Sequence, residues 1–235
     1  MLKLELHAHS AEDPADQIPH SSHELVDRAA ALGYHALAIT LHDRQLDLRS
    51  LAPYAGDRGI VLIPGIERTI EGRHVLLLNF SPAAEEVRSF DDLARLKAKE
   101  PGLVVAPHPF FPGGSCLGGL LERYAHLFDA VERNAMFTRT IDFNVRAERW
   151  AAAHGKPVVG NGDVHRLYQL GTCYSMVDAA PDPAAICDAV RQGRVTVVAE
   201  PLTLARAAGT MTDLVAAQLR PRASAGLLRP TPERA

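Results

Sequence analysis

Short apolar segments alternate with longer amphipathic segments along most of the chain. Residues 2–6 alternate apolar and charged positions, which is typical of a strand with one buried face. Continuous apolar runs, typical of strands covered on both faces, occupy residues 36–40, 60–64 and 103–106. Between the first two strands, apolar positions recur at helical spacing from Ser21, which can form a capping box with Glu24, until Gly33 ends the helix.

The same rhythm continues to about residue 200. Further helices are expected at residues 46–54, 90–99, 119–128, 141–154 and 183–192. Further strands are expected at residues 74–80, 130–131, 157–160, 174–177 and 195–199. This alternation predicts an α/β fold with a parallel sheet and outer helices, and the number of strands favours a closed barrel.

Composition is consistent with one large α/β domain, because 47% of the 235 residues are hydrophobic. The net charge of −3 gives no basic footprint for nucleic acid. The three cysteines, Cys116, Cys173 and Cys187, lack metal-knuckle spacing and suggest a reducing cytoplasm. We expect a cytoplasmic protein without a membrane span, because no leader and no sufficiently long apolar run is present.

A pair of histidines closes the first predicted strand. His7 and His9 stand two residues apart, so an extended chain presents both on one face. Paired imidazoles suit a borderline divalent metal such as zinc, manganese or iron. Taken alone, the pair favours a metal only modestly over two surface histidines.

Other predicted strands also end in ligand-type residues. In a parallel barrel, the loops after the strands converge on one face, where chemistry collects. The candidate metal ligands at these positions are His7, His9, His42, Glu67, His108, Asp163 and His165, and a further candidate, His74, stands at the start of the expected hairpin strand beside Glu67. This set exceeds what one ion takes, so we expect two or three divalent ions with a bridging carboxylate. Such a centre would hydrolyse a phosphoester, with a metal-bridging hydroxide as nucleophile.

Six ordered segments resemble the motifs of the PHP (polymerase and histidinol phosphatase) family over roughly residues 1–200. They are Leu-His-Ala-His-Ser, Ala-Ile-Thr-Leu-His-Asp, Pro-Gly-Ile-Glu, His-Val-Leu-Leu-Leu-Asn, Ala-Pro-His-Pro-Phe and Gly-Asn-Gly-Asp-Val-His. The resemblance implies a distorted TIM-like barrel with seven strands, up to three divalent metals and phosphoesterase activity. The family's ligands would fall on the candidate set above.

The chain departs from the family pattern at two positions. Leu41 stands before His42, where the family usually has an aspartate. The family's first-loop ligand has no clean match within the loop of residues 10–20. Asp13 is the nearest candidate, with Asp16 and His20 as alternatives.

Arginines follow several candidate ligands. Arg44, Arg68 and Arg166 are predicted to act with Glu67, Asp163 and His165 in catalysis, because guanidinium groups bind phosphate oxygens bidentately. Arg133 and Asn134, at another strand end, are secondary candidates. Each arginine could instead form an ordinary surface ion pair.

The remaining segments carry less chemistry. The glycine-rich loop at residues 110–119 lacks the features of a phosphate-binding loop and could be a lid or a connector. Residues 201–219 could pack as a closing helix through Leu204, Ala207, Met211, Leu214 and Val215. Residues 220–235 are expected to form a loose tail.

Three functions follow from these observations. The first is a phosphoesterase that uses Zn, Mn or Fe ions and acts on a small phosphorylated substrate, with a nucleotide or oligonucleotide also possible. The second is an amidohydrolase-like enzyme that cleaves an amide or lactone at the same metals. The third is a non-catalytic metal- or ligand-binding module, suggested by the two departures from the family pattern. Oligomeric state is not indicated by the sequence.

Overall fold

The computed structural model describes residues 1–219, so the predicted tail at residues 220–235 lies outside the described residues. Nine strands form one sheet in the order β7-β6-β5-β4-β3-β2-β1-β8-β9. Their bounds are β1 Leu2–Ala8, β2 Ala36–Ile39, β3 Val61–Ile70, β4 Arg73–Leu78, β5 Leu103–Ala106, β6 Ala130–Asn134, β7 Val158–Asn161, β8 Cys173–Val177 and β9 Val195–Ala199. The α-helices are α1 Ser22–Ala31, α2 Leu51–Gly56, α3 Phe90–Lys99, α4 Leu120–Arg123, α5 Asn144–His154, α6 Pro183–Arg191 and α7 Leu204–Leu219.

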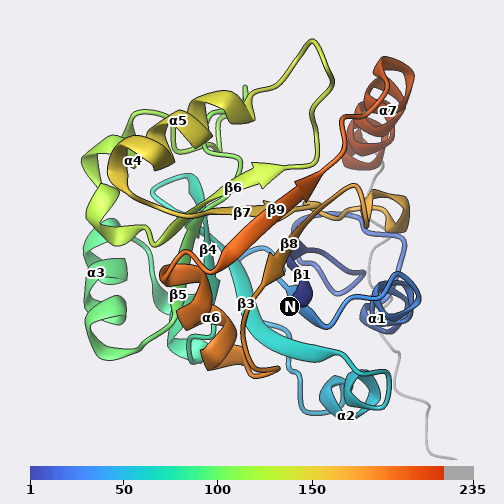
Figure 1. Ribbon diagram of the computed structural model, residues 1–235, viewed down its shortest axis with the longest axis horizontal. Helices are drawn as coiled ribbons and strands as arrows, with labels where there is room; N and C mark the ends of the chain where they lie inside the picture. Colours follow the sequence, from blue (N-terminus) through green and yellow to red (C-terminus); the bar gives the residue numbers. More distant parts are fainter. Residues whose placement is uncertain (220–235) are drawn as a thin grey trace, which may run out of the picture.

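The sheet curls until β7 returns to β1 and β8. Val164, just after β7, pairs in parallel with Ala8 at the end of β1. Farther down the seam, the Ser175 hydroxyl on β8 accepts from the Gly160 amide at 2.9 Å and lies 3.1 Å from the Gly160 carbonyl. The predicted α/β barrel is confirmed, with helices α1–α5 around its outside (Figure 1).

The sheet is mixed rather than wholly parallel, and it contains the hairpin strand expected after residue 73. β4 is antiparallel to β3 and β5, and β8 is antiparallel to β1 and β9. Glu71 and Gly72 join β3 to β4 with positive φ angles of 49° and 78°. A two-residue turn of this kind reverses the chain, whereas a parallel connection needs a crossover of a dozen residues or more.

Helix α6 covers the barrel end opposite to the ends of the parallel strands. Its buried Ile186 and Val190 pack with Leu4 of β1 and Leu103 at the start of β5. In Figure 1 this helix lies across the front of the barrel. The other end of the barrel therefore remains available for polar side chains.

The first strand is buried more completely than its sequence predicted. Glu5 was expected on an exposed face, but it is fully buried, and its carboxylate accepts from the amides of His7 and Gly162. β1 lies between β2 and β8 in the sheet, and all of its residues from Leu4 to Ala8 are buried.

Several helices are shorter than predicted. α2 begins only at Leu51, α5 begins at Asn144, and the segment predicted at 119–128 splits into α4 and a 3₁₀ turn at Ala125–Leu127. Helix α5 ends as predicted at Gly155, whose φ of 62° is the left-handed conformation that glycine favours.

The C-terminal helix forms, and two of the five apolar residues expected to pack it, Ala207 and Leu214, are half-buried. Met211 and Val215 are exposed, as is Leu204. Polar contacts also hold α7: Tyr168 donates its hydroxyl to Asp213 at 3.0 Å, and Arg206 donates to the Tyr168 carbonyl at 2.9 Å. Within residues 1–219, no helix is both long enough and apolar enough to cross a membrane.

Candidate metal centre

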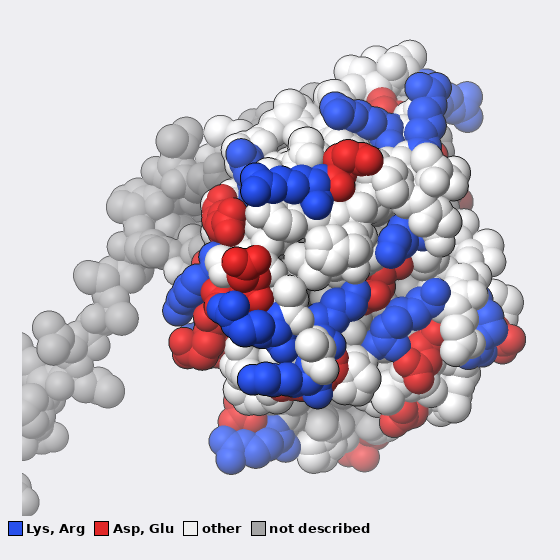
Figure 2. Space-filling model, turned by 90° about the vertical axis from the view of Figure 1, so that its left-hand side faces the viewer, with Lys and Arg blue, Asp and Glu red and all other residues white. Residues whose placement is uncertain are grey.

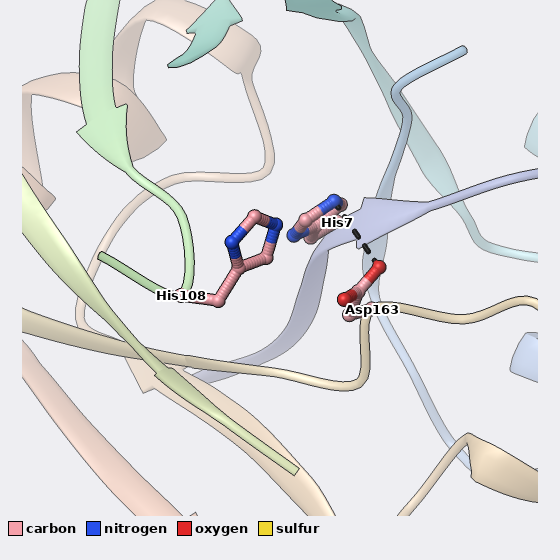
Figure 3. Close-up of side chains that lie close together, drawn as sticks. All are labelled: His7, His108 and Asp163. Atoms are coloured by element: carbon pink, nitrogen blue, oxygen red, sulfur yellow. Dashed lines mark ion pairs between the residues drawn. The ribbon is translucent and has the colours of Figure 1, made fainter. Parts of the chain in front are cut away.

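The predicted ligands meet at the barrel end where the parallel strands terminate. His7 lies at the end of β1, His108 follows β5, and Asp163 follows β7, so three distant segments bring these side chains together (Figure 3). His9, His42 and His165 reach the same place from the loops after β1, β2 and β7.

Glu67 and His74 reach the cluster by a different route. The sequence placed Glu67 just after a strand, but β3 continues to Ile70 and Glu67 lies within it. Because β4 runs antiparallel to β3, the start of β4 lies at the same barrel end, and His74 pairs there with Thr69. The hairpin therefore brings a histidine from a strand start to a site otherwise built from strand ends.

Glu67 is the centre of the cluster, and its two carboxylate oxygens face different imidazoles. Oε2 lies 3.2 Å from His7 Nε2, 3.3 Å from His9 Nε2 and 3.2 Å from His42 Nε2. Oε1 lies 2.7 Å from His74 Nδ1 and 3.2 Å from His108 Nε2. One buried carboxylate thus stands between two groups of histidines.

These donor atoms fit divalent ions. Ligands in a tetrahedron around zinc lie about 3.3 Å apart, because each bond is about 2.0–2.1 Å long. The spacing of the Nε2 atoms from Glu67 Oε2 matches this value. Moreover, the Nε2 atoms of His7 and His9 are buried and make no hydrogen bond. Leaving such groups unpaired is costly, whereas an ion between them would use their lone pairs.

Asp163 forms a second junction on the same side of the cavity. Its Oδ1 lies 3.4 Å from His7 Nε2, 3.7 Å from His9 Nε2 and 3.4 Å from His165 Nδ1. His165 Nε2 lies 3.0 Å from Asp16 Oδ2 at the mouth of the cavity. Sets of three donors suited to a metal form around both carboxylates, including His7, His9 and Glu67, or His9, Asp163 and His165.

The first-loop candidates lie in three different positions. Asp13 lies behind the cluster, where its Oδ2 accepts from His9 Nδ1 at 2.9 Å and from His42 Nδ1 at 3.0 Å. Asp16 faces the cavity through His165, while His20 contacts the backbone carbonyl of His9 at 2.9 Å. Asp13 therefore orients two imidazoles with their Nε2 atoms directed inward, which is the usual role of a carboxylate behind a metal-bound histidine.

Glu132 orients His7 in the same way that Asp13 orients His9 and His42. Its Oε2 lies 2.7 Å from His7 Nδ1, and its oxygens also accept from the amides of Asn134 and Asn161 at 2.9 and 3.1 Å. Asn134 was a secondary candidate from the sequence, whereas no role was assigned to Glu132. Glu132 could have been found from its position, because it lies two residues before Asn134 and therefore on the same inward face of β6.

Glu5 supports the cluster through the backbone. Its carboxylate accepts from the amides of His7 at 3.1 Å and Gly162 at 2.9 Å. A side chain at position 162 would meet Glu5 and Val164, so glycine is required there. The next residue, Asp163, has a φ of 49°, an uncommon left-handed conformation that directs its carboxylate into the site.

The charges in the cluster are strongly coupled. Burial disfavours the protonated form of His7, but Asp163, Glu132 and Glu67 outweigh burial and raise the pKa of His7 well above 6.5. Burial likewise disfavours ionised Glu67, yet His7, His74 and His42 hold the pKa of Glu67 well below 4.5. Without ions, protons on the imidazoles compensate the carboxylates.

The predicted arginines do not line the cavity. Arg68 is buried and bonds to the Val87 carbonyl at 2.6 Å and to Asp43. Arg44 bonds to the Glu12 carbonyl, and Arg166 to the carbonyls of His165 and Asp213. Arg133 pairs with Asp142 and Glu148. All four guanidinium groups are thus held by other partners. Arg68 and Arg133 directly follow Glu67 and Glu132 within strands, so their side chains point to the opposite side of the strand.

The cavity over the cluster has a volume of about 370 Å³. Its lining residues are Ala15, Asp16, His42, Asp43, Glu67, Thr69, His74, His108, Ser115, Asp163 and His165. Thr69 and Ser115 were not anticipated from the sequence. On the face of the molecule that carries α3, lysines and arginines are interleaved with acidic residues rather than gathered in one patch (Figure 2).

The structure combines a barrel fold with a cluster of histidines and carboxylates at one barrel end. Known proteins with similar structure include metal-dependent enzymes of the same fold. A family model described as PHP-associated matches residues 142–195, which include Asp163 and His165. A two-domain protein from Bacteroides vulgatus containing a predicted PHP-like metal-dependent phosphoesterase is similar in structure, with a TM-score of 0.66 and 20% identity. The match covers 85% of this chain and 65% of that protein. The matched segment and the shared fold agree with the resemblance to the PHP family that the motifs carry.

Other solved structures share the fold. An amidohydrolase from Chromobacterium violaceum, with bound sulfate and no metal, has a TM-score of 0.55 and 18% identity over 69% of this chain and 87% of that one. A lesion-specific endonuclease from Pyrococcus furiosus has a TM-score of 0.55 and 15% identity over 89% of this chain and 66% of that one. At such identities the likeness concerns the fold. No curated protein matches the sequence significantly.

Proposed function

We propose that this protein is a metal-dependent hydrolase, and specifically a phosphoesterase acting on a small phosphate ester. The observation that carries the proposal is the position of Glu67, whose Oε2 faces one group of imidazoles and whose Oε1 faces another. A carboxylate in this position suits a pair of ions, and paired ions are a recurrent arrangement in enzymes that hydrolyse phosphoesters.

Bound divalent ions would supply a water of lowered pKa and positive charge for the phosphoryl oxygens. The chain's own residues hold that arrangement in place. His7, His9 and Glu67 would bind one ion, and His74, His108 and Glu67 a second. Asp163 and His165, with Asp16 at the cavity mouth, would bind a third.

Charge favours an anionic substrate. The three proposed ions would bring six positive charges, against five negative charges from the carboxylates that face the ions or their histidines, namely Asp13, Asp16, Glu67, Glu132 and Asp163. Arg44, Arg68 and Arg166 are engaged elsewhere, so the ions rather than guanidinium groups would attract the phosphate. Thr69 and Ser115, which line the cavity, are placed to contact the bound ester.

The size of the cavity favours a compact substrate. A volume of about 370 Å³ is near the lower end of the range for small-molecule sites, which runs from about 300 to 1,000 Å³. We therefore place a small phosphorylated molecule, such as a mononucleotide or sugar phosphate, ahead of an oligonucleotide.

The test combines metal analysis with a substrate panel. Purified protein should contain divalent metal and hydrolyse a generic phosphomonoester, and His9→Ala and Asp163→Ala should reduce turnover by about 10²-fold or more. His23→Ala, on the exposed face of α1, is the matched control and should retain activity.

The panel also contains amides, lactones and short oligonucleotides. Turnover of amides or lactones alone would replace the phosphoesterase with the amidohydrolase alternative. Bound metal without turnover of any compound would favour the binding module. Unchanged phosphatase activity in both site variants would contradict the proposed centre.

A further inference from the structure

The thiol of Cys116 contacts a proposed metal ligand. Cys116 Sγ lies 3.5 Å from His108 Nδ1, and the cysteine is buried. From the sequence, this residue was one of three scattered cysteines without metal spacing. The fold brings it to the cluster because the glycine-rich loop after β5 turns back over His108.

That loop is fixed against the β3–β4 hairpin. His74 donates its amide to the Ser115 carbonyl at 2.8 Å, and Arg73 donates to the Cys116 carbonyl at 3.2 Å. Gly118 donates its amide to Pro109 at 2.8 Å, which closes the loop. The sulfur is therefore held in place by the backbone on both sides of it.

The contact stands out when the other imidazoles are compared. His7 has the Glu132 carboxylate at Nδ1, and His9 and His42 share Asp13. His165 Nδ1 lies 3.0 Å from the carbonyl of Asp163. Each of these histidines thus has an oxygen acceptor behind it, whereas His108 has a sulfur.

We propose that Cys116 is a positioning residue for His108 in metal binding. The Sγ atom accepts the Nδ1–H of His108, which leaves the Nε2 lone pair directed toward the cavity, 3.2 Å from Glu67 Oε1. If the thiol donated to Nδ1 instead, Nε2 would carry the proton and could not bind a metal. The proposal rests on the metal centre described above.

The choice of sulfur has a consequence for affinity. A thiol sulfur is a weaker hydrogen-bond acceptor than a carboxylate oxygen, and its hydrogen bonds are longer. It therefore raises the basicity of the histidine bonded to it less than a carboxylate would. The ion bound by His74, His108 and Glu67 should therefore dissociate more readily than the ion bound by His7, His9 and Glu67.

The test separates a polar role of the thiol from simple packing. Metal-free protein, prepared with a chelator, is titrated with Zn²⁺ and with Mn²⁺ by calorimetry. Cys116→Ser keeps an acceptor and should retain both affinities within about threefold, whereas Cys116→Val fills the space without an acceptor. The valine variant should weaken binding of the ion held by His74, His108 and Glu67 about tenfold or more, and should leave binding of the ion held by His7, His9 and Glu67 unchanged.

Cys187→Ala is the matched control, because it removes a buried thiol from α6 at the opposite barrel end. Cys116→Ala, which cannot overpack the loop, replaces the valine variant if that variant does not fold. The role of Cys116 would be overturned if the valine or alanine variant bound metal as tightly as the parent. It would also be overturned if the serine variant bound metal as weakly as the valine variant. A parent protein that binds neither ion would overturn the metal centre and this inference together.

Discussion

Glu132 Oε2 lies 2.7 Å from His7 Nδ1, and both side chains are fully buried inside the barrel. The carboxylate fixes the imidazole so that its other nitrogen faces Glu67 and Asp163. A residue outside the cavity thus determines the direction of a proposed metal ligand.

Glu132→Gln should weaken metal binding about 10- to 100-fold, the effect typical of removing a partner behind a ligand. Both oxygens of Glu132 accept hydrogen bonds, so a glutamine NH₂ group would face a donor on one side. Isothermal titration with Zn²⁺ or Mn²⁺ measures the change. Glu86→Gln, at an exposed position, is the control, and identical affinities in the two variants would contradict the assigned role.

Glu67→Gln should remove more than one ion at a time, because two groups of histidines share this carboxylate. We expect a lower metal-to-protein ratio and a loss of turnover of at least about 10²-fold. Elemental analysis and phosphatase assays measure both quantities. If the ratio stayed at the parent value while turnover fell, Glu67 would not join two sites.

The stability of metal-free protein should decline as the pH rises above neutrality. His7, His9 and His108 have raised pKa values, so their stabilisation is complete below 6.5 and is lost as the pH rises through the raised values. Depressed pKa values at Glu67 and Asp163 act oppositely, and their stabilisation is lost on strong acidification.

Melting temperatures between pH 4 and pH 9 test this expectation, with a maximum expected in mildly acidic buffer. Saturating Zn²⁺ should move the maximum to a higher pH, because ions replace the protons that compensate the carboxylates. A metal-free protein that gained stability steadily from pH 6 to pH 9 would contradict the coupling described here.

Arg68→Met should lower the free energy of unfolding by about 2–4 kcal/mol, because Asp43 and the Val87 carbonyl would lose a buried charged donor. Chemical denaturation measures this change.

Arg44→Ala and Arg166→Ala should change KM for a phosphomonoester less than about threefold, since both guanidinium groups bond to backbone carbonyls. Steady-state kinetics measures KM for each alanine variant. A large rise in KM for either alanine variant would restore the sequence-based assignment of a phosphate-binding arginine.

The sequence contained the fold class and the residue types of the candidate centre. Period-2 and period-3.6 patterns depend on local geometry, so they predicted the alternation of strands and helices that the structure shows. Ligand-type residues at successive strand ends predicted a common site, because parallel strands of a barrel end on one side. His7, Glu67, His108 and Asp163 meet there as expected.

The tertiary structure decided which neighbour each of these groups has. The hairpin that brings His74 beside Glu67 was expected from the turn before it, whereas the turn of the loop after β5 that brings Cys116 beside His108 was not. Burial of β1 on both faces made Glu5 an interior residue, and alternation along the chain directed Arg68 away from the cavity. Such contacts depend on strand direction and three-dimensional distance, which residue spacing along the chain does not specify.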